Sequence, residues 1–261
     1  MITELKELDD MRELEQLFAE IWGRSGQPPI VSGLLMALAH SGSYVAGARV
    51  DGRMAGGLVG WLGGLPPNRL HLHSHILGVD PGSQARGLGF QLKQHQRAWC
   101  LERGVESIEW TFDPLVRRNA YFNLNKLGAE AREYLVNFYG PMADGINAGE
   151  ESDRILIDWR LDSQRAEEAA AGRPRDPSDQ DLHDAGMLLD AEPGAEPVLH
   201  QSSAPVVVCR LPDDIVALRR EDPKLARAWR LAVRKALGDA FDAGYRITGV
   251  TRGGWYVLTR L

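Results

Sequence analysis

Apolar and polar residues recur along this chain in two periods, one of about 3.6 residues and one of two, which predict alternating helices and strands. In residues 3–21, for example, apolar residues fall near one helical face, and acidic residues gather in the first half. The predicted helices are residues 3–21, 30–39, 88–101, 118–127 and 222–243. The predicted strands are residues 44–50, 54–62, 70–79, 107–112, 133–139, 155–161, 205–211, 245–250 and 255–261.

Short sequence signals support several connections between these elements. Asp51-Gly52, between two strand-like runs, is a strong hairpin signal. In the last helix Asp222 is placed to cap the N-terminus, Pro223 takes the first helical position, and Gly244 follows the C-terminus.

The same patterns divide the chain into three parts. Residues 1–161 mix strands and helices. Residues 162–204 are rich in acids, Ala, Gly and Pro and lose clear periodicity, so we expect a linker or an irregular excursion. Residues 205–261 follow the order strand, helix, strand, strand and predict a smaller α+β extension, for which a degenerate copy of half of the first domain is one interpretation.

Composition excludes several classes of protein. The chain has 261 residues, 44% hydrophobic and 25% charged, as in soluble globular proteins. Its net charge of −6 argues against a nucleic-acid partner or an anionic membrane surface. Cys100 and Cys209 lie outside any CxxC pattern, which excludes a disulfide framework and a cysteine-rich zinc site. No apolar stretch approaches the roughly 18 residues of a membrane span, and the N-terminus is acidic, so we expect a cytoplasmic protein.

A glycine-rich turn after Val79 is the strongest candidate for chemistry. Backbone N–H groups at a helix start favour an anion, and glycine lets a phosphate approach them closely. Gly82 and Gly87 have the spacing of a nucleotide-triphosphate loop without its Lys-Ser/Thr, and Gly87-x-Gly89 lacks the third glycine of a dinucleotide fingerprint. A third pattern, Q/R-x-x-G-x-G/A, matches QARGLG at residues 84–89 in full. A tight left-handed turn alone would explain the glycines, but it would not need the Gln and Arg as well.

In its strand–loop–helix setting, this motif resembles the loop of the GNAT superfamily of acyl-coenzyme A-dependent N-acyltransferases. The order of elements over residues 1–161 is similar to that superfamily as well. The stretches LHSHILGV, WTFDPLVRRNAYFNLNKLGA and NFYG resemble a subfamily of predicted acetyltransferases, some of whose relatives occur beside N-acylamino-acid racemases. The resemblance implies an α/β fold with a central mixed, mostly antiparallel sheet flanked by helices, to which the C-terminal extension is added.

The resemblance also implies how coenzyme A would bind. The loop would hold the pyrophosphate on its backbone amides, and the end of the preceding strand would pair with the pantetheine arm and place the thioester. Asn119 is a candidate to hydrogen-bond the cofactor arm or a bound water. The implied cofactor-binding residues of the strand and loop are Leu77, Gly78, Val79, Gln84, Ala85, Arg86, Gly87, Leu88 and Gly89. The implied co-substrate is acetyl-CoA or another acyl-CoA, and no metal is implied.

Three histidines alternate along the strand that precedes the loop, at positions 71, 73 and 75. A period of two places them on one face, and we expect Val79 on that same face. An ordinary imidazole, with a pKa of about 6.5, suits removal of a proton from an amine. His73 or His75 is therefore the candidate general base. Two alternatives stay open: ordinary polar positions, or metal ligands, although no partner has recognisable spacing.

A proton donor for the departing thiolate is harder to assign. The superfamily often has a tyrosine four residues before the glycine that ends the next helix. That glycine would be Gly128, and this chain has Leu124 at the tyrosine's place. Tyr121 is the alternative acid, although it would serve equally well as a core aromatic residue. A thiolate is also a good enough leaving group to depart unassisted.

Three charged residues near the end of the next strand are candidates for binding the substrate. Asp113 would bind an ammonium group, or it would cap the turn before Pro114. Arg117 and Arg118 would hold a carboxylate of the acceptor or of a succinyl group, or they would be solvated surface residues.

The resemblance implies transfer of an acetyl or succinyl group to a small amine, such as an amino acid, by direct attack in a ternary complex. Two alternatives have different acceptors, a protein or an aminoglycoside, and another is a CoA-binding module without activity. The expected partners are the CoA thioester and the amine, with no nucleic acid and no membrane, and a homodimer is left open.

Overall fold

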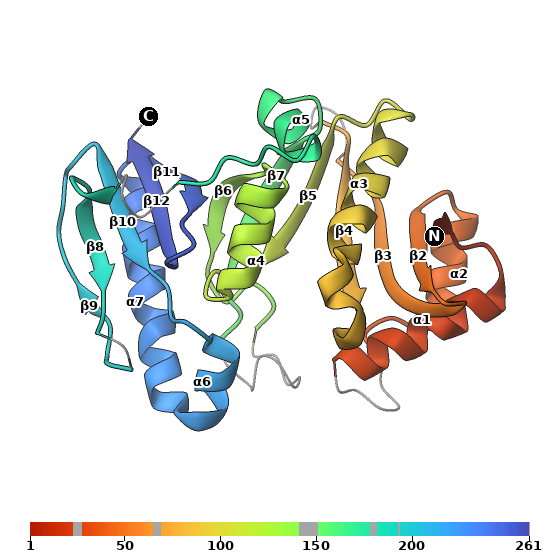
Figure 1. The fold of residues 1–261 in the computed structure, drawn as a ribbon, viewed down its shortest axis with the longest axis horizontal. Coiled ribbons are helices and arrows are strands. Elements are labelled where there is room, and N and C mark those ends of the chain that lie inside the picture. The colour runs from red at the N-terminus through yellow and green to blue at the C-terminus, as the bar shows by residue number, and fades with distance from the viewer. Residues whose placement is uncertain (23–27, 65–68, 141–150, 178–181, 193, 261) are drawn as a thin grey trace. The chain divides into compact units, whose positions relative to one another are not determined.

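The computed structural model describes all residues except 23–27, 65–68, 141–150, 178–181, 193 and 261, and it leaves the side chains of Gln84 and Ala85 undescribed (Figure 1). The described chain forms two compact units, Met1–Trp110 and Thr111–Leu261.

The first unit combines strands and helices in the order expected from the sequence. Its elements are β1 (Ile2–Glu4), α1 (Leu8–Ile21), α2 (Ser32–His40), β2 (Tyr44–Val50), β3 (Arg53–Gly63), β4 (His71–Val79), the 3₁₀ helix η1 (Pro81–Arg86), α3 (Leu88–Leu101) and β5 (Ser107–Phe112), whose last two residues begin the second unit. Neighbouring strands from β1 to β4 are antiparallel, whereas β4 and β5 are parallel.

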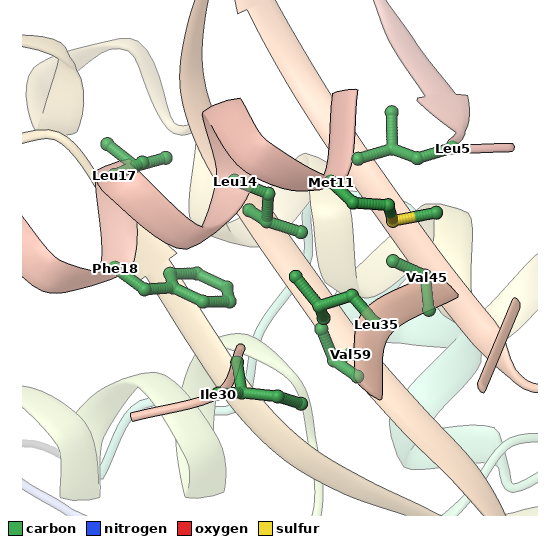
Figure 2. Close-up of a cluster of buried hydrophobic side chains, with 9 residues drawn as sticks. All are labelled: Leu5, Met11, Leu14, Leu17, Phe18, Ile30, Leu35, Val45 and Val59. Atoms are coloured by element: carbon green, nitrogen blue, oxygen red, sulfur yellow. The ribbon is translucent and has the colours of Figure 1, made fainter. Parts of the chain in front are cut away.

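Helices α1 and α3 cover opposite faces of this sheet, as two consecutive glycines of β3 show. A Cβ atom on Gly56 would meet Leu92 of α3 at 3.1 Å, whereas a Cβ on Gly57 would meet Leu14 of α1 at 2.1 Å. The α1 side holds the apolar core shown in Figure 2, which consists of Leu5, Met11, Leu14, Leu17, Phe18, Ile30, Leu35, Val45 and Val59. Burial of these side chains is the main term that favours folding of this unit.

Strand β4 contains a β-bulge at His75. Ser74 lies opposite Gly60 and Ile76 lies opposite Val59, so His75 is an extra residue without an opposite partner. After the bulge the side chains change faces: a Cβ on Gly78 would meet Phe18 of α1, whereas Val79 lies near the α3 side. The expectation that Val79 shares a face with the histidines is therefore wrong, because the bulge interrupts the period of two.

The second unit contains a strand pair, a separate sheet and several helices. Its elements are α4 (Arg117–Tyr121), the π-helical turn η2 (Phe122–Lys126), β6 (Glu130–Leu135), β7 (Arg154–Arg160), α5 (Gln164–Ala170), β8 (Gly186–Asp190), β9 (Val198–Leu199), β10 (Val206–Arg210), α6 (Ile215–Glu221), α7 (Pro223–Asp242), β11 (Tyr245–Val250) and β12 (Trp255–Arg260). Strands β6 and β7 are antiparallel, and the separate sheet has the order β11-β12-β10-β8-β9.

Most predicted elements are confirmed, with shifts at their ends. In the last helix Asp222 caps the N-terminus, accepting a hydrogen bond from the Leu225 amide, and Pro223 begins the helix as predicted. The first helix begins at Leu8 rather than at residue 3, because residues 2–4 pair with β2 as a strand that the sequence reading missed.

The segment 162–204 is the main correction to the predicted elements. It contains helix α5 and strands β8 and β9, and β8 pairs in parallel with β10. Irregular structure was the wrong expectation for these residues. Only five residues of β8 and two of β9 carry the pattern, and β8 pairs with β10 outside the segment as well as with β9, so local periodicity is a weak signal here.

The fold class is confirmed: mixed α/β, with a mostly antiparallel sheet flanked by helices and an additional C-terminal sheet. The division into domains at residues 161 and 204 stays a prediction. Among the described residues, no helix combines the length and the apolar character needed to cross a membrane.

Candidate functional site

The glycine-rich segment forms a compact turn between β4 and α3. The amide of Asp80 donates to the Ala55 carbonyl at 2.9 Å, and the amide of Ser83 donates to the Asp80 carbonyl at 2.8 Å. Helix α3 then begins after Gly87, which has a left-handed backbone with φ +70°. Glycine adopts this conformation without steric cost, and it has no side chain to cap the helix N-terminus. The helix start therefore has the features of an anion site.

The space around this helix start fits the approach of a phosphate. A Cβ atom on Gly87 would meet nothing within 4 Å, so its surface is open. A Cβ on Gly89 would lie 3.8 Å from Val79 and 3.9 Å from Leu77, which brings α3 close to the end of β4. The side chain of Leu88 is buried, so only its backbone is suited to contact a ligand.

One of the implied cofactor residues, Gly78, also has a packing role. Gly78 faces α1, where a Cβ would lie 2.8 Å from Ile21 and 3.0 Å from Phe18, so a larger residue would push α1 away from β4. Arg86 is exposed and accepts a hydrogen bond on its carbonyl from Gln91. The side chains of Gln84 and Ala85 lie outside the described part of the structure.

The described parallel register of β4 and β5 is short. It comprises Leu72 with Ile108 and His73 with Glu109. The described register therefore ends well before Val79.

His73, His75 and Trp61 form an aromatic cluster on one face of β3 and β4. Trp61 lies opposite His73 in the register, and its ring centroid is 5.1 Å from that of His73 and 4.7 Å from that of His75. The two imidazole centroids are 5.9 Å apart. His73 is half-buried, whereas His75 is exposed. The predicted shared face is thus confirmed for these two histidines.

Both imidazoles favour the neutral form. Burial lowers the pKa of His73 to about 4, with further lowering by the charges of His75, His71 and Lys93. Partial desolvation of its ring, which lies against Trp61, also lowers the pKa of His75. At neutral pH both side chains therefore carry a free ring nitrogen that is able to accept a proton.

The third histidine, His71, lies in the same register as His73 and has a carboxylate as its neighbour. The Nε2 atom of His71 lies 3.6 Å from a carboxylate oxygen of Glu109 on β5. Among the described residues there is no group of three or more His, Cys, Asp or Glu side chains placed to hold a metal ion.

The remaining predicted site residues belong to the second unit. The Tyr121 hydroxyl donates to Asp176 at 2.5 Å, and burial followed by the Asp176 hydrogen bond raises the pKa of this tyrosine. Leu124, at the place of the superfamily's tyrosine, is buried in the core. Asn119 is exposed, and its amide bonds the Val116 carbonyl at the start of α4.

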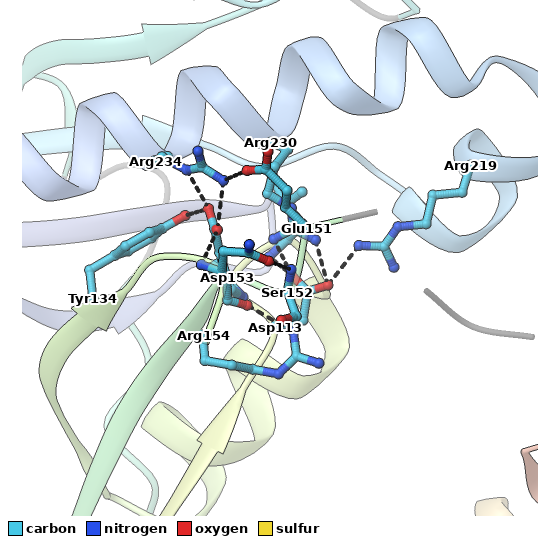
Figure 3. A network of polar contacts seen from close by, with 12 residues as sticks. Asp113, Tyr134, Glu151, Ser152, Asp153, Arg154, Arg219, Arg230 and Arg234 are labelled. Carbon is cyan, nitrogen blue, oxygen red and sulfur yellow. Dashed lines mark hydrogen bonds and ion pairs between the residues drawn. The ribbon is translucent and has the colours of Figure 1, made fainter. Parts of the chain in front are cut away.

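Asp113 is the centre of a buried ionic network (Figure 3). Its carboxylate accepts two hydrogen bonds from Arg230, each of 2.8 Å, and one of 2.6 Å from Arg219. Burial alone would raise the pKa of Asp113, but the two guanidinium groups hold it well below the ordinary value. Asp113 also accepts a hydrogen bond from the Leu115 amide, which is the capping role. With its charge compensated inside the protein, we no longer propose it as a ligand for a substrate ammonium.

The two arginines that were candidates for carboxylate binding differ in their surroundings. Arg117 forms an ion pair with Asp213 at 3.1 Å. Arg118 is exposed on α4. Their role toward a substrate stays a prediction.

Two residues near the histidines were missed from the sequence. Trp61 contacts both imidazoles. Lys93 is buried and donates a hydrogen bond to Ser74, the residue between His73 and His75 in the sequence. The signal for Trp61 was the pairing of β3 with β4, in which Trp61 lies opposite His73. A lysine one position from Leu92, on the apolar side of a predicted helix, was the signal for Lys93.

Comparison with known proteins agrees with this geometry. The model of the acetyltransferase (GNAT) family matches residues 8–128. No curated protein matches the sequence. The structure of the ribosomal-protein-S18-alanine N-acetyltransferase from Escherichia coli is similar at 18% identity and a TM-score of 0.50, over 62% of this chain and 94% of that one.

Two further solved structures have the same fold. The protein smu.2055 from Streptococcus mutans UA159 is 15% identical with a TM-score of 0.52, over 62% of this chain and 99% of the other. Naa20 from Chaetomium thermophilum, solved with a bisubstrate analogue, is 15% identical with a TM-score of 0.50, over 61% of this chain and 86% of the other. The family match, the shared fold and the loop between β4 and α3 lead to one conclusion: residues 8–128 of this chain form an acetyltransferase domain of the GNAT family.

Proposed function

We propose that the protein transfers an acetyl or succinyl group from an acyl-CoA to a small amine, such as an amino acid, within a ternary complex. One observation carries this proposal: β4 bears two neutral histidines, and the next helix, α3, has an open N-terminus at Gly87. The family supports a CoA thioester as co-substrate, and the resemblance to relatives beside N-acylamino-acid racemases supports the amino acid.

The residues of the first unit fit the thioester substrate. The start of α3 and Gly87 would bind the pyrophosphate, because backbone amides there point out of an uncapped helix end. The edge of β4 would bind the pantetheine arm and bring the thioester carbonyl toward His73 and His75. When bound, the thioester supplies an activated acyl group and a thiolate leaving group.

The histidines would manage the proton of the acceptor. As the amine nitrogen bonds to the carbonyl carbon and the carbon–sulfur bond breaks, the nitrogen loses a proton to a neutral imidazole, directly or through water. The electron pair leaves on sulfur as the thiolate of CoA, which takes a proton from Tyr121 or from solvent. Tyr121 donates a hydrogen bond to Asp176, so solvent is the simpler source.

A thiol-release assay tests this proposal. Acetyl-CoA and succinyl-CoA are each incubated with the protein and a set of amino acids and polyamines, and free thiol is measured. Release that depends on the amine is expected, with H73Q or H75Q lowering kcat by about 10²-fold at unchanged CoA affinity. CoA binding without any thiol release would identify an inactive CoA-binding module, and a wild-type rate in both variants would refute the assignment of the base.

A further inference from the structure

Lys93 of α3 is a buried lysine that lies against β4, the strand that bears His73 and His75. Lys93 is only 2% exposed, and its ammonium donates to the Ser74 hydroxyl at 2.8 Å and to the Gln96 side-chain oxygen at 3.4 Å. The same nitrogen lies 3.6 Å from the centroid of the Trp110 ring on β5. The ammonium is thus held between three elements, α3, β4 and β5.

Such a group is unfavourable for stability alone. None of the described hydrogen bonds or ion pairs of Lys93 involves a carboxylate, and an ammonium without a counter-ion loses much of its hydration energy on burial. Burial lowers the pKa of Lys93 to about 7. A methionine would fill nearly the same volume without this cost, so the lysine calls for a role other than packing.

The position of Ser74 indicates that role. Ser74 stands between His73 and His75, beside the bulge, and its side chain points toward α3 while both imidazoles contact Trp61 on the other face. Lys93 is therefore bonded to the one residue that joins the two candidate bases.

We infer that Lys93 is a positioning residue for acyl transfer, whose ammonium anchors Ser74 under the bulge of β4 and adds a positive charge beneath His73. This inference rests on the proposed function, because it concerns the same strand.

The electrostatic effect of Lys93 on His73 follows from the charges around β4. A cation beneath β4 opposes a second positive charge on the neighbouring imidazole. His73 feels this effect after burial and after the influence of His75 and His71, and the carboxylate of Glu109 faces His71. On α3, the Cys100 thiol also interacts with Lys93. Because the ammonium is charged below about pH 7, it acts over the range in which His73 would otherwise take up a proton.

Two variants separate the charge from the anchor. K93M removes both, and S74A removes the anchor but keeps the cation. K224M, at an exposed lysine at the start of α7, is the matched control. The titration midpoint of His73 is measured by NMR, with H73Q to assign its signal, and kcat is measured against pH by thiol release.

The expected results differ between the variants. In K93M the His73 midpoint rises by about 0.5 pH unit, and the acid limb of kcat moves to higher pH by the same amount. In S74A the midpoint stays within error while kcat falls severalfold. K224M matches the wild type in both measurements. Because K93M removes a buried charge, we expect its free energy of unfolding to be no lower than that of the wild type, and its CoA affinity to be unchanged.

Other outcomes would decide against the inference. An unchanged His73 midpoint in K93M overturns the electrostatic role, and a wild-type kcat in S74A overturns the anchor. If the midpoint moves in K93M but the wild type releases no thiol from any acyl-CoA, the placement of the charge is upheld while the proposed function fails. The NMR titration needs no activity, so the two failures are distinguishable.

Discussion

The carboxylate of Asp113 and the guanidinium groups of Arg219 and Arg230 compensate one another almost without solvent. Close by, Asp153 accepts hydrogen bonds from Tyr134 and from Arg234, and Arg234 also pairs with Glu151 (Figure 3). A buried network of this kind costs desolvation energy to form, but it costs more to break, because removing one group leaves the remaining buried charges unbalanced.

Asp113→Asn tests this balance at the level of one residue. The substitution keeps the shape but removes the buried negative charge to which Arg219 and Arg230 both donate, so we expect the free energy of unfolding to fall by about 3–5 kcal/mol in urea titrations. Asp9→Asn, at an exposed carboxylate paired with Arg12, is the control and is expected to change it by less than about 0.5 kcal/mol. A loss as small as that of the control would contradict the role given to Asp113.

The imidazole of His73 makes the stability of the protein depend on pH. Its pKa is lowered to about 4 in the folded protein from an ordinary value of 6.5, so the unfolded chain binds more protons between these two values. The contribution of His73 to the free energy of unfolding is fully present above about pH 6.5, and it is lost as the pH falls toward 4. Allowing for its partial exposure, we expect this loss to be about 1–2 kcal/mol.

Urea titrations of the wild type and of H73Q at several pH values between 4 and 7 check this dependence. The difference between the two proteins should change across the window, because glutamine does not titrate. H200Q, at an exposed histidine of the second unit, is the control and should follow the wild type. Parallel curves for the wild type and H73Q would show that His73 takes up protons equally well in both states.

The turn between β4 and α3 is an element whose backbone serves both folding and binding. Gly87 and Gly104 both have φ +70°, and a Cβ atom on either would meet nothing within 4 Å. They differ in position, because Gly87 begins α3 whereas Gly104 follows its end.

This pair supplies a matched test. G87A and G104A are each expected to lower the free energy of unfolding by about 1 kcal/mol, because alanine is strained in the left-handed region. Only G87A should weaken CoA binding, by about tenfold or more in calorimetry, because its Cβ stands where the phosphate approaches. Equal CoA affinities in the two variants would mean that the pyrophosphate binds elsewhere.

How far the elements could be predicted depended on whether their signals were local. The hairpin at Asp51-Gly52, the cap at Asp222 and the turn after Val79 are encoded by a few adjacent residues, and they were found. The bulge at His75 was not, because it depends on how β3 pairs with β4, and this misplaced Val79. Strand β8 was missed for the same reason, since it is defined by pairing with the short strand β9 and with β10.

The candidate site was predicted to a similar extent. The loop residues and the histidines were identified from spacing and resemblance, whereas Trp61 and Lys93 became evident only from contacts across the sheet. Asp113 had two interpretations in the sequence, and the choice between them came from Arg219 and Arg230, which lie about a hundred residues later. A charge partner so distant leaves no pattern near Asp113.

At the scale of the whole molecule, the second unit joins residues on both sides of the predicted boundary at 161. Asn125 of η2 exchanges two hydrogen bonds with the backbone of Val250 on β11, each of 3.0 Å. Arg165 of α5 donates to the carbonyls of Leu124 and Thr248. Residues 111–161 therefore depend on the C-terminal extension for several of their buried partners.

A chain that ends at residue 161 tests this dependence. It would lack the arginines of α6 and α7 that neutralise Asp113 and Asp153, so we expect it to lose cooperative thermal unfolding and to aggregate in size-exclusion chromatography. The full chain is the control. A monomeric, cooperatively folded fragment that still binds CoA would instead support a separate domain at residues 1–161.

Removing residue 75 would leave a regular strand. Ser74 would then be followed directly by Ile76 opposite Gly60 and Val59, and every remaining side chain of β4 would keep its present face. Neither packed layer of the first unit requires the additional position. The fold therefore accommodates a shorter β4 without rearrangement, which makes His75 an insertion that can be deleted or exchanged to alter reactivity while the scaffold stays as it is.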